Sequence, residues 1–94
     1  MDRVGKQSLT DLLRIPPEIK KGEIRLTVTG NGRIWAENYK GILELSKDQL
    51  ILRGNRLKVL IGGKNLCMEY FNKDVLLVSG EIRRIQFDEL ERGN

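Results

Sequence analysis

The residues that can carry out acid–base or metal chemistry are few in this chain. Histidine is absent from its 94 residues, which removes the commonest general base and the commonest ligand of transition metals. Cys67 is the single cysteine, so no second thiol or imidazole is present to complete a zinc site with it. A catalytic thiol also needs an electropositive, partly exposed setting. We therefore expect a structural role for Cys67 and no metal site.

Two other groups have residue types suited to acid–base or phosphate chemistry. Glu37 and Glu44 can approach each other across a hairpin centred near Tyr39-Lys40, and two close carboxylates can act as acid and base. Gly62-Gly63-Lys64 is superficially similar to a phosphate loop, but the longer glycine spacing and the following helix are missing. Exposed glutamates are ordinary on strands, so we expect no enzymatic activity and no cofactor.

The bulk properties are those of a single soluble domain. Hydrophobic residues make up 39% of the chain and charged residues 32%, a composition typical of folded proteins. The longest uncharged apolar run, residues 75–78, is far shorter than the roughly 20 residues of a membrane-spanning helix. A single cysteine excludes an internal disulfide, which fits a reducing compartment. A cytoplasmic location is the expectation.

The net charge of +4 is modest, and its distribution leaves two interpretations open. Basic residues are spread along the chain, which favours a solvated surface. The alternative is a nucleic-acid or anionic-membrane-surface binding β domain that combines stacking with charge. The residues proposed for that alternative are Arg33, Arg53, Arg56, Lys58 and Trp35.

The N-terminal segment, residues 1–22, predicts one short helix. Leu9, Leu12 and Leu13 share one helical face, and Pro16-Pro17 ends the helix. Such a short helix is marginal alone and must dock its leucines. Its own sheet and a partner protein both remain open as the docking surface.

The region from residue 23 to residue 88 predicts a β domain, followed by a C-terminal tail at 89–94. Ile24, Leu26 and Val28 alternate with polar residues, as in a strand with one buried face. Gly30-Asn31-Gly32 is a strong hairpin signal, and further turn residues recur at spacings near ten. The predicted strands are residues 23–29, 33–38, 42–46, 49–53, 56–61, 65–71, 75–79 and 81–87.

About eight short strands with short connections predict an all-β fold. The expected architecture is a compact antiparallel sandwich or roll with a short N-terminal helix. A short β-solenoid is the alternative, because apolar residues flank glycine turns at Gly54, Gly63 and Gly80. Their uneven spacing favours hairpins.

The stretch Asn38-Tyr39-Lys40-Gly41 lies between two predicted strands. A left-handed Gly41 and an Asn38 side chain bonded to the turn backbone suit a tight corner. Alternatively, Trp35 and Tyr39 form an exposed aromatic contact, since such residues are enriched in interface hot spots. The candidate interaction surface comprises Trp35, Asn38, Tyr39, Lys40, Arg83 and Ile85.

One or both of strands 33–38 and 81–87 are predicted to be edges of the sheet, and an exposed edge can pair with another chain. Simple alternation divides the second strand between two faces: Glu81, Arg83 and Ile85 on one, Ile82, Arg84 and Gln86 on the other. Apolar and charged residues on both faces suit contact with a further surface. We expect homo-oligomerisation or docking of an edge to a partner; the competing interpretation is a charged edge that prevents pairing.

Several motifs in order resemble one known family. They are Glu37-Asn38-Tyr39-Lys40-Gly41-Ile42-Leu43-Glu44, Gly63-Lys64-Asn65-Leu66, and Gly80-Glu81-Ile82 with Ile85-Gln86-Phe87. Their order and spacing resemble the YabP/YqfC family of bacterial sporulation proteins over residues 12–88. The opening Ile15-Pro16-Pro17-Glu18-Ile19 is similar to the YqfC-like branch, whereas the Gly54-Asn55 connection is shorter than in relatives.

The resemblance implies a biological setting rather than a chemistry. It implies a small mother-cell protein of endospore formation, cytoplasmic or peripheral at the forespore membrane. It also implies a protein partner, a membrane-anchored sporulation protein similar to YqfD, and no enzymatic activity, cofactor or functional residue. The expected function is a non-enzymatic assembly or adaptor module that acts through protein–protein contacts.

Overall fold

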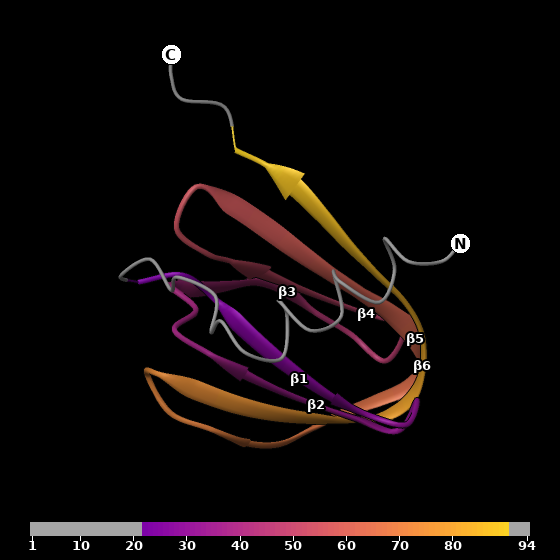
Figure 1. The fold of residues 1–94 in the computed structure, drawn as a ribbon. Coiled ribbons are helices and arrows are strands. Elements are labelled where there is room, and N and C mark those ends of the chain that lie inside the picture. The colour runs from indigo at the N-terminus through magenta and orange to yellow at the C-terminus, as the bar shows by residue number, and fades with distance from the viewer. Residues whose placement is uncertain (1–21, 91–94) are drawn as a thin grey trace, which may run out of the picture.

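Two long, bent strands organise the fold. The computed structural model describes residues 22–90, which form one antiparallel sheet in the order β1-β2-β6-β5-β4-β3. β5 and β6 pair with each other along most of their length and bend near their middle, so the sheet folds over on itself (Figure 1). The strands are β1 (Arg25–Thr29), β2 (Arg33–Glu37), β3 (Gly41–Leu45), β4 (Gln49–Arg53), β5 (Leu57–Phe71) and β6 (Val75–Glu89).

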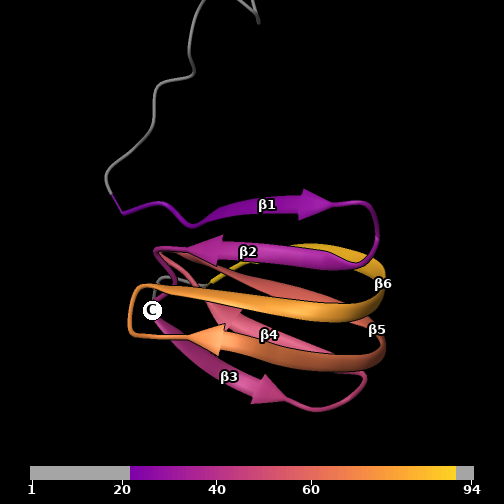
Figure 2. The same ribbon diagram turned by 90° about the horizontal axis from the view of Figure 1, so that it is seen from below.

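Folding the sheet produces two layers. The first layer contains β1, β2, residues 75–79 of β6 and residues 67–71 of β5. The second layer contains β3, β4, residues 57–64 of β5 and residues 81–89 of β6. β1 and β3 lie at opposite margins of the molecule (Figure 2). The predicted all-β antiparallel fold is thus confirmed, and the alternative of a β-solenoid is wrong.

The predicted number of strands is wrong for a physical reason. Residues 62–64 and Gly80 were expected to be turns, but they are bends inside the continuous strands β5 and β6. A Cβ atom on Gly63 would lie 2.0 Å from the carbonyl oxygen of Glu81. At Gly80, where φ is 138°, it would lie 2.7 Å from the carbonyl oxygen of Asn65. Glycine therefore allows the two backbones to approach at the bend. The helix predicted within residues 1–22 lies outside the described residues, apart from Gly22.

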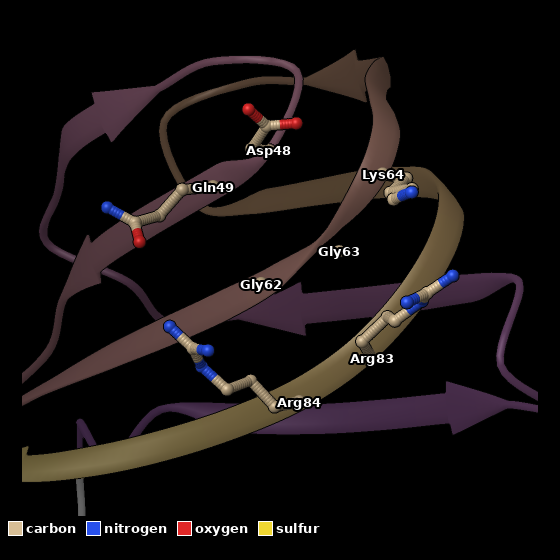
Figure 3. Close-up of a pocket in the computed structure, with 7 residues that line it drawn as sticks. All are labelled: Asp48, Gln49, Gly62, Gly63, Lys64, Arg83 and Arg84. Carbon is tan, nitrogen blue, oxygen red and sulfur yellow. The ribbon is translucent and has the colours of Figure 1, made fainter.

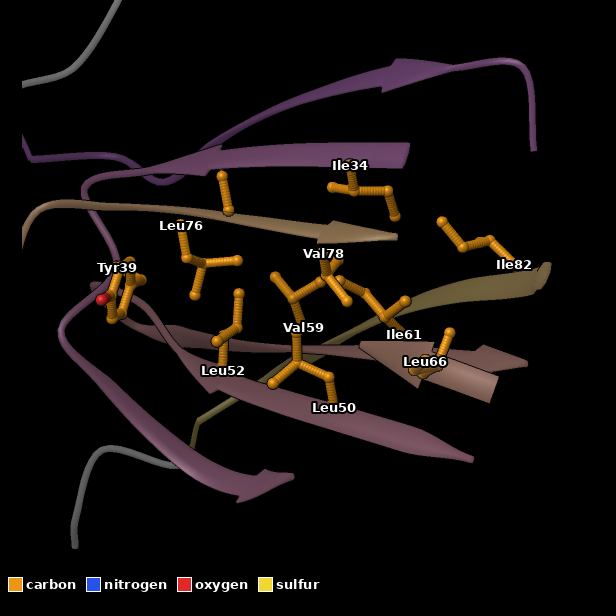
Figure 4. Close-up of a cluster of buried hydrophobic side chains, with 11 residues drawn as sticks. Ile34, Tyr39, Leu50, Leu52, Val59, Ile61, Leu66, Leu76, Val78 and Ile82 are labelled. Carbon is orange, nitrogen blue, oxygen red and sulfur yellow. The ribbon is translucent and has the colours of Figure 1, made fainter. Parts of the chain in front are cut away.

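The hydrophobic core lies between the two layers (Figure 4). Alternation places Ile34 and Ala36 of β2 inward from one side, and Leu50 and Leu52 of β4 inward from the other. Each fully buried aliphatic side chain contributes about 1.5–3 kcal/mol to stability. The buried hydrophobic residues are Ile34, Ala36, Tyr39, Leu50, Leu52, Val59, Ile61, Leu66, Leu76, Val78 and Ile82.

The two hairpins β1–β2 and β3–β4 are related by an internal repeat. β3 begins 16 residues after β1, and β4 begins 16 residues after β2. Each hairpin turn accepts two hydrogen bonds from a bend in a long strand. Asn31 and Gly32 accept from Ile82 (2.9 Å) and Gly80 (3.1 Å) of β6. The equivalent turn residues, Lys47 and Asp48, accept from Leu66 (2.8 Å) and Gly63 (3.0 Å) of β5. The turns therefore hold both bends in place.

Candidate interaction surfaces

The six residues predicted to form one interaction surface lie in three separate places. Simple proximity in sequence suggested a patch, but the chain crosses between the layers after β2. Trp35 lies on the outer face of the first layer; Asn38, Tyr39 and Lys40 form the crossing; Arg83 and Ile85 belong to the second half of β6.

Tyr39 is a core residue. Its side chain is only 7% exposed, and its hydroxyl donates a hydrogen bond to the backbone carbonyl oxygen of Asn72. Burial raises the pKa of the Tyr39 phenol, and the nearby Asp74 carboxylate raises it further. The prediction of an exposed aromatic contact at Tyr39 is wrong, because its ring fills one end of the core (Figure 4).

Asn38 forms the corner that turns the chain from the first layer to the second. Its φ of 65° is left-handed, a conformation expected for Gly41 but adopted by Asn38 instead. Its backbone N–H donates to the carbonyl oxygen of Asp74 at 2.8 Å, and its side-chain amide donates to the carbonyl oxygen of Glu23 at 3.1 Å. Asparagine tolerates this conformation because its amide hydrogen-bonds locally.

Trp35 takes part in an aromatic stack on the outer face of the first layer. Its ring is 6.4 Å from that of Tyr70, and the two planes differ by 12°. In the sheet register, Leu77 lies between them, since it pairs with Trp35 on one side and with Tyr70 on the other. Trp35 is half-buried and Tyr70 is exposed. The sequence pattern indicates Trp35 but not its partner Tyr70, which comes from a strand more than thirty residues later in the chain.

A β-bulge changes the faces of the second half of β6. The register shifts between the pairs Gly62–Arg84 and Gly63–Ile82, so Arg83 is an extra residue. Ile82 is buried and Ile85 packs against the core, so both face the interior. The predicted alternation, which put these two residues on opposite faces, is therefore wrong.

The bulge places two consecutive arginines at one shallow depression (Figure 3). A Cβ atom on Gly62 would lie 3.3 Å from the Arg84 side chain, which lies across this glycine. Arg83 hydrogen-bonds Glu81 and holds the pKa of that carboxyl below its ordinary value. The depression has a volume of about 300 Å³ and is lined by Asp48, Gln49, Gly62, Gly63, Lys64, Arg83 and Arg84.

The candidate groups for acid–base chemistry do not come together. Glu37 is on β2 in the first layer, whereas Glu44 is on β3 in the second layer and accepts a hydrogen bond from Gln49 at 3.0 Å. β2 and β3 are not hairpin partners, so the predicted carboxylate pair is absent. Cys67 is exposed. Within residues 22–90, no group of three or more acidic, cysteine or histidine residues is arranged to hold a metal ion.

The exposed large apolar residues of the described region all lie on strands that lack a neighbour on one side, an arrangement that alternation along the sequence does not reveal. We call a strand segment a free-edge segment when, among the described residues, it pairs on one side only. These segments are β1, β3, residues 67–71 of β5 and residues 81–89 of β6. All seven large hydrophobic residues that are exposed within residues 22–90 lie on them: Val28, Ile42, Leu43, Leu45, Tyr70, Phe71 and Phe87.

Five of these seven residues lie on β3 and on residues 67–71 of β5. The two segments follow the same side of the sandwich, because hydrogen bonds tie both of their ends. At one end Tyr39 donates to Asn72, and at the other Leu66 donates to Lys47 at 2.8 Å. We name this surface the β3–β5 side; it comprises Ile42, Leu43, Leu45, Tyr70 and Phe71. Adjacent apolar pairs such as Tyr70-Phe71 were the available signal, since alternation cannot bury both.

Comparison with known proteins identifies the family of this chain. A model of the YabP family matches residues 20–94. The chain belongs to the YabP family. It is 30% identical over 84 residues to the uncharacterized protein YqfC of Bacillus subtilis (strain 168), which covers 89% of this chain and 90% of that protein. No solved structure matches the chain.

Membership of the YabP family confirms the resemblance drawn from the motifs. The matched region contains all six strands of the described sheet. Among the described residues of this YabP-family chain, no helix is long and apolar enough to cross a membrane.

Proposed function

We propose that this chain is a non-enzymatic assembly module of sporulation that binds a protein partner through the β3–β5 side. Membership of the YabP family indicates a sporulation-related protein. One structural observation carries the rest of the proposal: every exposed large hydrophobic residue of the described region lies on a free-edge segment. Exposed strand edges and exposed apolar side chains are the two features by which sheets accept a further strand.

The β3–β5 side supplies both kinds of contact. The unpaired edge of β3 offers backbone donors and acceptors to a partner strand, which gives affinity in β-strand addition. Leu43, which is 53% exposed, and Phe71, which is 61% exposed, offer apolar anchors beside that edge. Leu43 is the bulge residue of β3, because the register shifts between Ile42 and Glu44. A bulge prevents simple edge-to-edge aggregation and leaves selected side chains for a specific partner.

The partner in this proposal is a membrane-anchored sporulation protein similar to YqfD. The chain then acts in the mother-cell cytoplasm, at the surface of the forespore membrane. The modest net charge of +4 is compatible with residence near an anionic membrane surface.

Copurification from sporulating cells, followed by mass spectrometry and calorimetry with the purified partner, tests the proposal. We expect Leu43→Glu and Phe71→Glu to abolish capture of the membrane-anchored partner. Val28→Glu is the matched control, since Val28 is 47% exposed but lies on β1. The proposal fails if the chain captures no protein partner, or if all three variants bind as the wild type does.

A second candidate function, binding of a nucleic acid or an anionic membrane surface, is favoured by the depression at Lys64, Arg83 and Arg84. The basic and aromatic residues first considered for it do not share a face. Arg33 and Trp35 belong to β2 in the first layer, whereas Arg53 and Lys58 pair with each other in the second. Phosphate binding weakens steeply with salt, so titration with oligonucleotide and with anionic vesicles at two salt concentrations discriminates this function from protein binding.

A further inference from the structure

The second half of β6 is a long free-edge segment. Residues 81–89 pair with residues 57–64 of β5, and no other strand of the described region pairs with them. Phe87 is 58% exposed on this segment, although its partner in the register, Val59, is fully buried. An apolar side chain that faces inward and is still exposed marks a place where the layer ends without cover. The edge therefore offers both unpaired backbone and uncovered apolar area.

After the bulge at Arg83, the segment alternates regularly. Arg84, Gln86 and Asp88 pair with Gly62, Leu60 and Lys58, and they lie on the outer face. Ile85 and Phe87 pair with the buried residues Ile61 and Val59, and they lie on the inner face. The outer face thus carries a positive, a neutral and a negative residue in order, and the inner face carries two apolar residues.

This order is complementary to itself when reversed. The segment reads Arg83-Arg84-Ile85-Gln86-Phe87-Asp88-Glu89. If two copies run antiparallel with Gln86 at the centre, Arg84 lies opposite Asp88, and Ile85 lies opposite Phe87. Each pair shares a face, because residues directly opposite in an antiparallel ladder point to the same side. Arg83 lies in the bulge and hydrogen-bonds Glu81, so the complementarity is that of residues 84–88.

We propose that this chain forms a homodimer in which residues 84–88 of β6 pair antiparallel with the same residues of a second copy. The dimer joins the second layers of the two copies into one continuous sheet and covers Phe87. It leaves the β3–β5 side open, since β3 and the second half of β6 are at opposite ends of the second layer. The proposal is independent of the partner assigned above.

The pattern also selects the register. Centring the pair on Ile85 instead would leave Arg84 opposite Gln86, without an acidic partner. Like charges directly opposite each other destabilise a sheet, whereas opposite charges and apolar pairs stabilise it. Arginines on an exposed edge would block pairing in most strands, but here Arg84 has Asp88 at its symmetric position, and Arg83 hydrogen-bonds Glu81 of its own strand.

A charge exchange between Arg84 and Asp88 tests the dimer by sedimentation equilibrium. We expect the wild type to dimerise, and Arg84→Glu alone or Asp88→Arg alone to raise the dissociation constant about tenfold. In a mixture of these two variants, a heterodimer forms two pairs of opposite charge. The new Glu at position 84 lies opposite the new Arg at position 88, and the remaining Asp88 lies opposite the remaining Arg84. Native mass spectrometry should therefore detect the heterodimer in preference to either homodimer.

Arg53→Glu is the matched control. This substitution changes the charge by the same amount, but it lies on β4, which pairs with a strand on both sides. Circular dichroism checks that each variant is folded; if Lys58 makes Asp88→Arg unstable, Gln86→Lys brings two like charges together at the symmetry axis instead. A wild type that stays monomeric up to millimolar concentration would overturn the proposal. So would a dimer that Arg84→Glu and Gln86→Lys leave intact, or a mixture that dimerises no better than its components.

Discussion

The Tyr39 hydroxyl donates a hydrogen bond to the backbone carbonyl oxygen of Asn72, 33 residues later in the chain. This bond ties the corner between β2 and β3 to the turn between β5 and β6. The same turn accepts the backbone N–H of Asn38 at the Asp74 carbonyl oxygen, at 2.8 Å. The most distinctive motif of the sequence is therefore a clasp between segments that are distant in the chain.

Removal of this hydroxyl should weaken the fold. We expect Tyr39→Phe to lower the free energy of unfolding by about 1 kcal/mol, because a partly buried carbonyl loses its donor. Urea denaturation followed by tryptophan fluorescence measures the loss. Tyr70→Phe is the matched control, since the Tyr70 hydroxyl is exposed and accepts only from the Asn72 side chain. Equal losses in both variants would contradict the clasp.

Alkaline pH should destabilise the fold through the same residue. Burial and the Asp74 carboxylate raise the Tyr39 pKa above its ordinary value of 10.0. In the unfolded chain the phenol ionises near pH 10.0, whereas in the folded chain it keeps its proton to higher pH. The protonated Tyr39 phenol therefore contributes its full stability below the unfolded-state pKa, and this stability is lost as the pH rises through the folded-state pKa. Between about pH 9 and 11, the urea midpoint should fall more steeply for the wild type than for Tyr39→Phe; identical slopes would exclude this role.

The bend in β5 should tolerate no side chain at Gly63. A Cβ atom there would lie 2.0 Å from the Glu81 carbonyl oxygen. The backbones of Gly63 and Glu81 are both paired in the sheet, so neither can move away easily. We expect Gly63→Ala to lower the free energy of unfolding by about 3 kcal/mol or more. Gly32→Ala is the control, because nothing lies within 4 Å of a Cβ atom at that position. Chemical denaturation compares the two, and a similar effect in both would show that the close approach is not required.

The dimer predicts a specific cross-link. Gln86 lies opposite its own copy, so a cysteine at this position places two thiols at the symmetry axis. In a Cys67→Ser background, Gln86→Cys should form a disulfide-linked dimer on mild oxidation, because cross-strand Cβ atoms lie within disulfide reach. Lys73→Cys in the same background, exposed in the β5–β6 turn, should remain monomeric. Non-reducing electrophoresis reads the result; efficient cross-linking at residue 73 but not at residue 86 would exclude the pairing.

Residue patterns within a few positions correctly predicted the first hairpin and the short strands β2 and β4. The Gly30-Asn31-Gly32 hairpin is confirmed, because positive φ and alternation are encoded within a few residues. β2 and β4 also follow their predicted strands closely. Glycine, however, allows both a turn and a close crossing of two strands. Only the partner strand distinguishes these uses at Gly63 and Gly80, and the partner is remote in sequence.

The candidate interaction surfaces likewise depend on contacts between strands that are remote in the sequence. The exposure of Trp35 and Tyr39 depends on what covers each strand, which alternation alone does not specify. The bulge at Arg83 shifts every later side chain by one position, so the predicted faces of β6 were exchanged. Of the two candidate edges, residues 81–87 are confirmed as an edge among the described residues, whereas strand 33–38 is not an edge, because β2 pairs with both β1 and β6.

β6 belongs to both layers, and this affects how the protein can fold during synthesis. During synthesis β1 and β2 leave the ribosome first, yet the second neighbour of β2 is β6, the last strand of the described sheet. Neither layer is complete until that final strand arrives, and its pairing with β2 joins residues far apart in the chain, which makes that pairing slow to form. A nascent chain interrupted before β6 would expose the inner faces of β2 and β5 together. We therefore expect chaperones and proteases to recognise chains that lack β6, because exposed apolar surface and unpaired strand edges mark incompletely folded proteins.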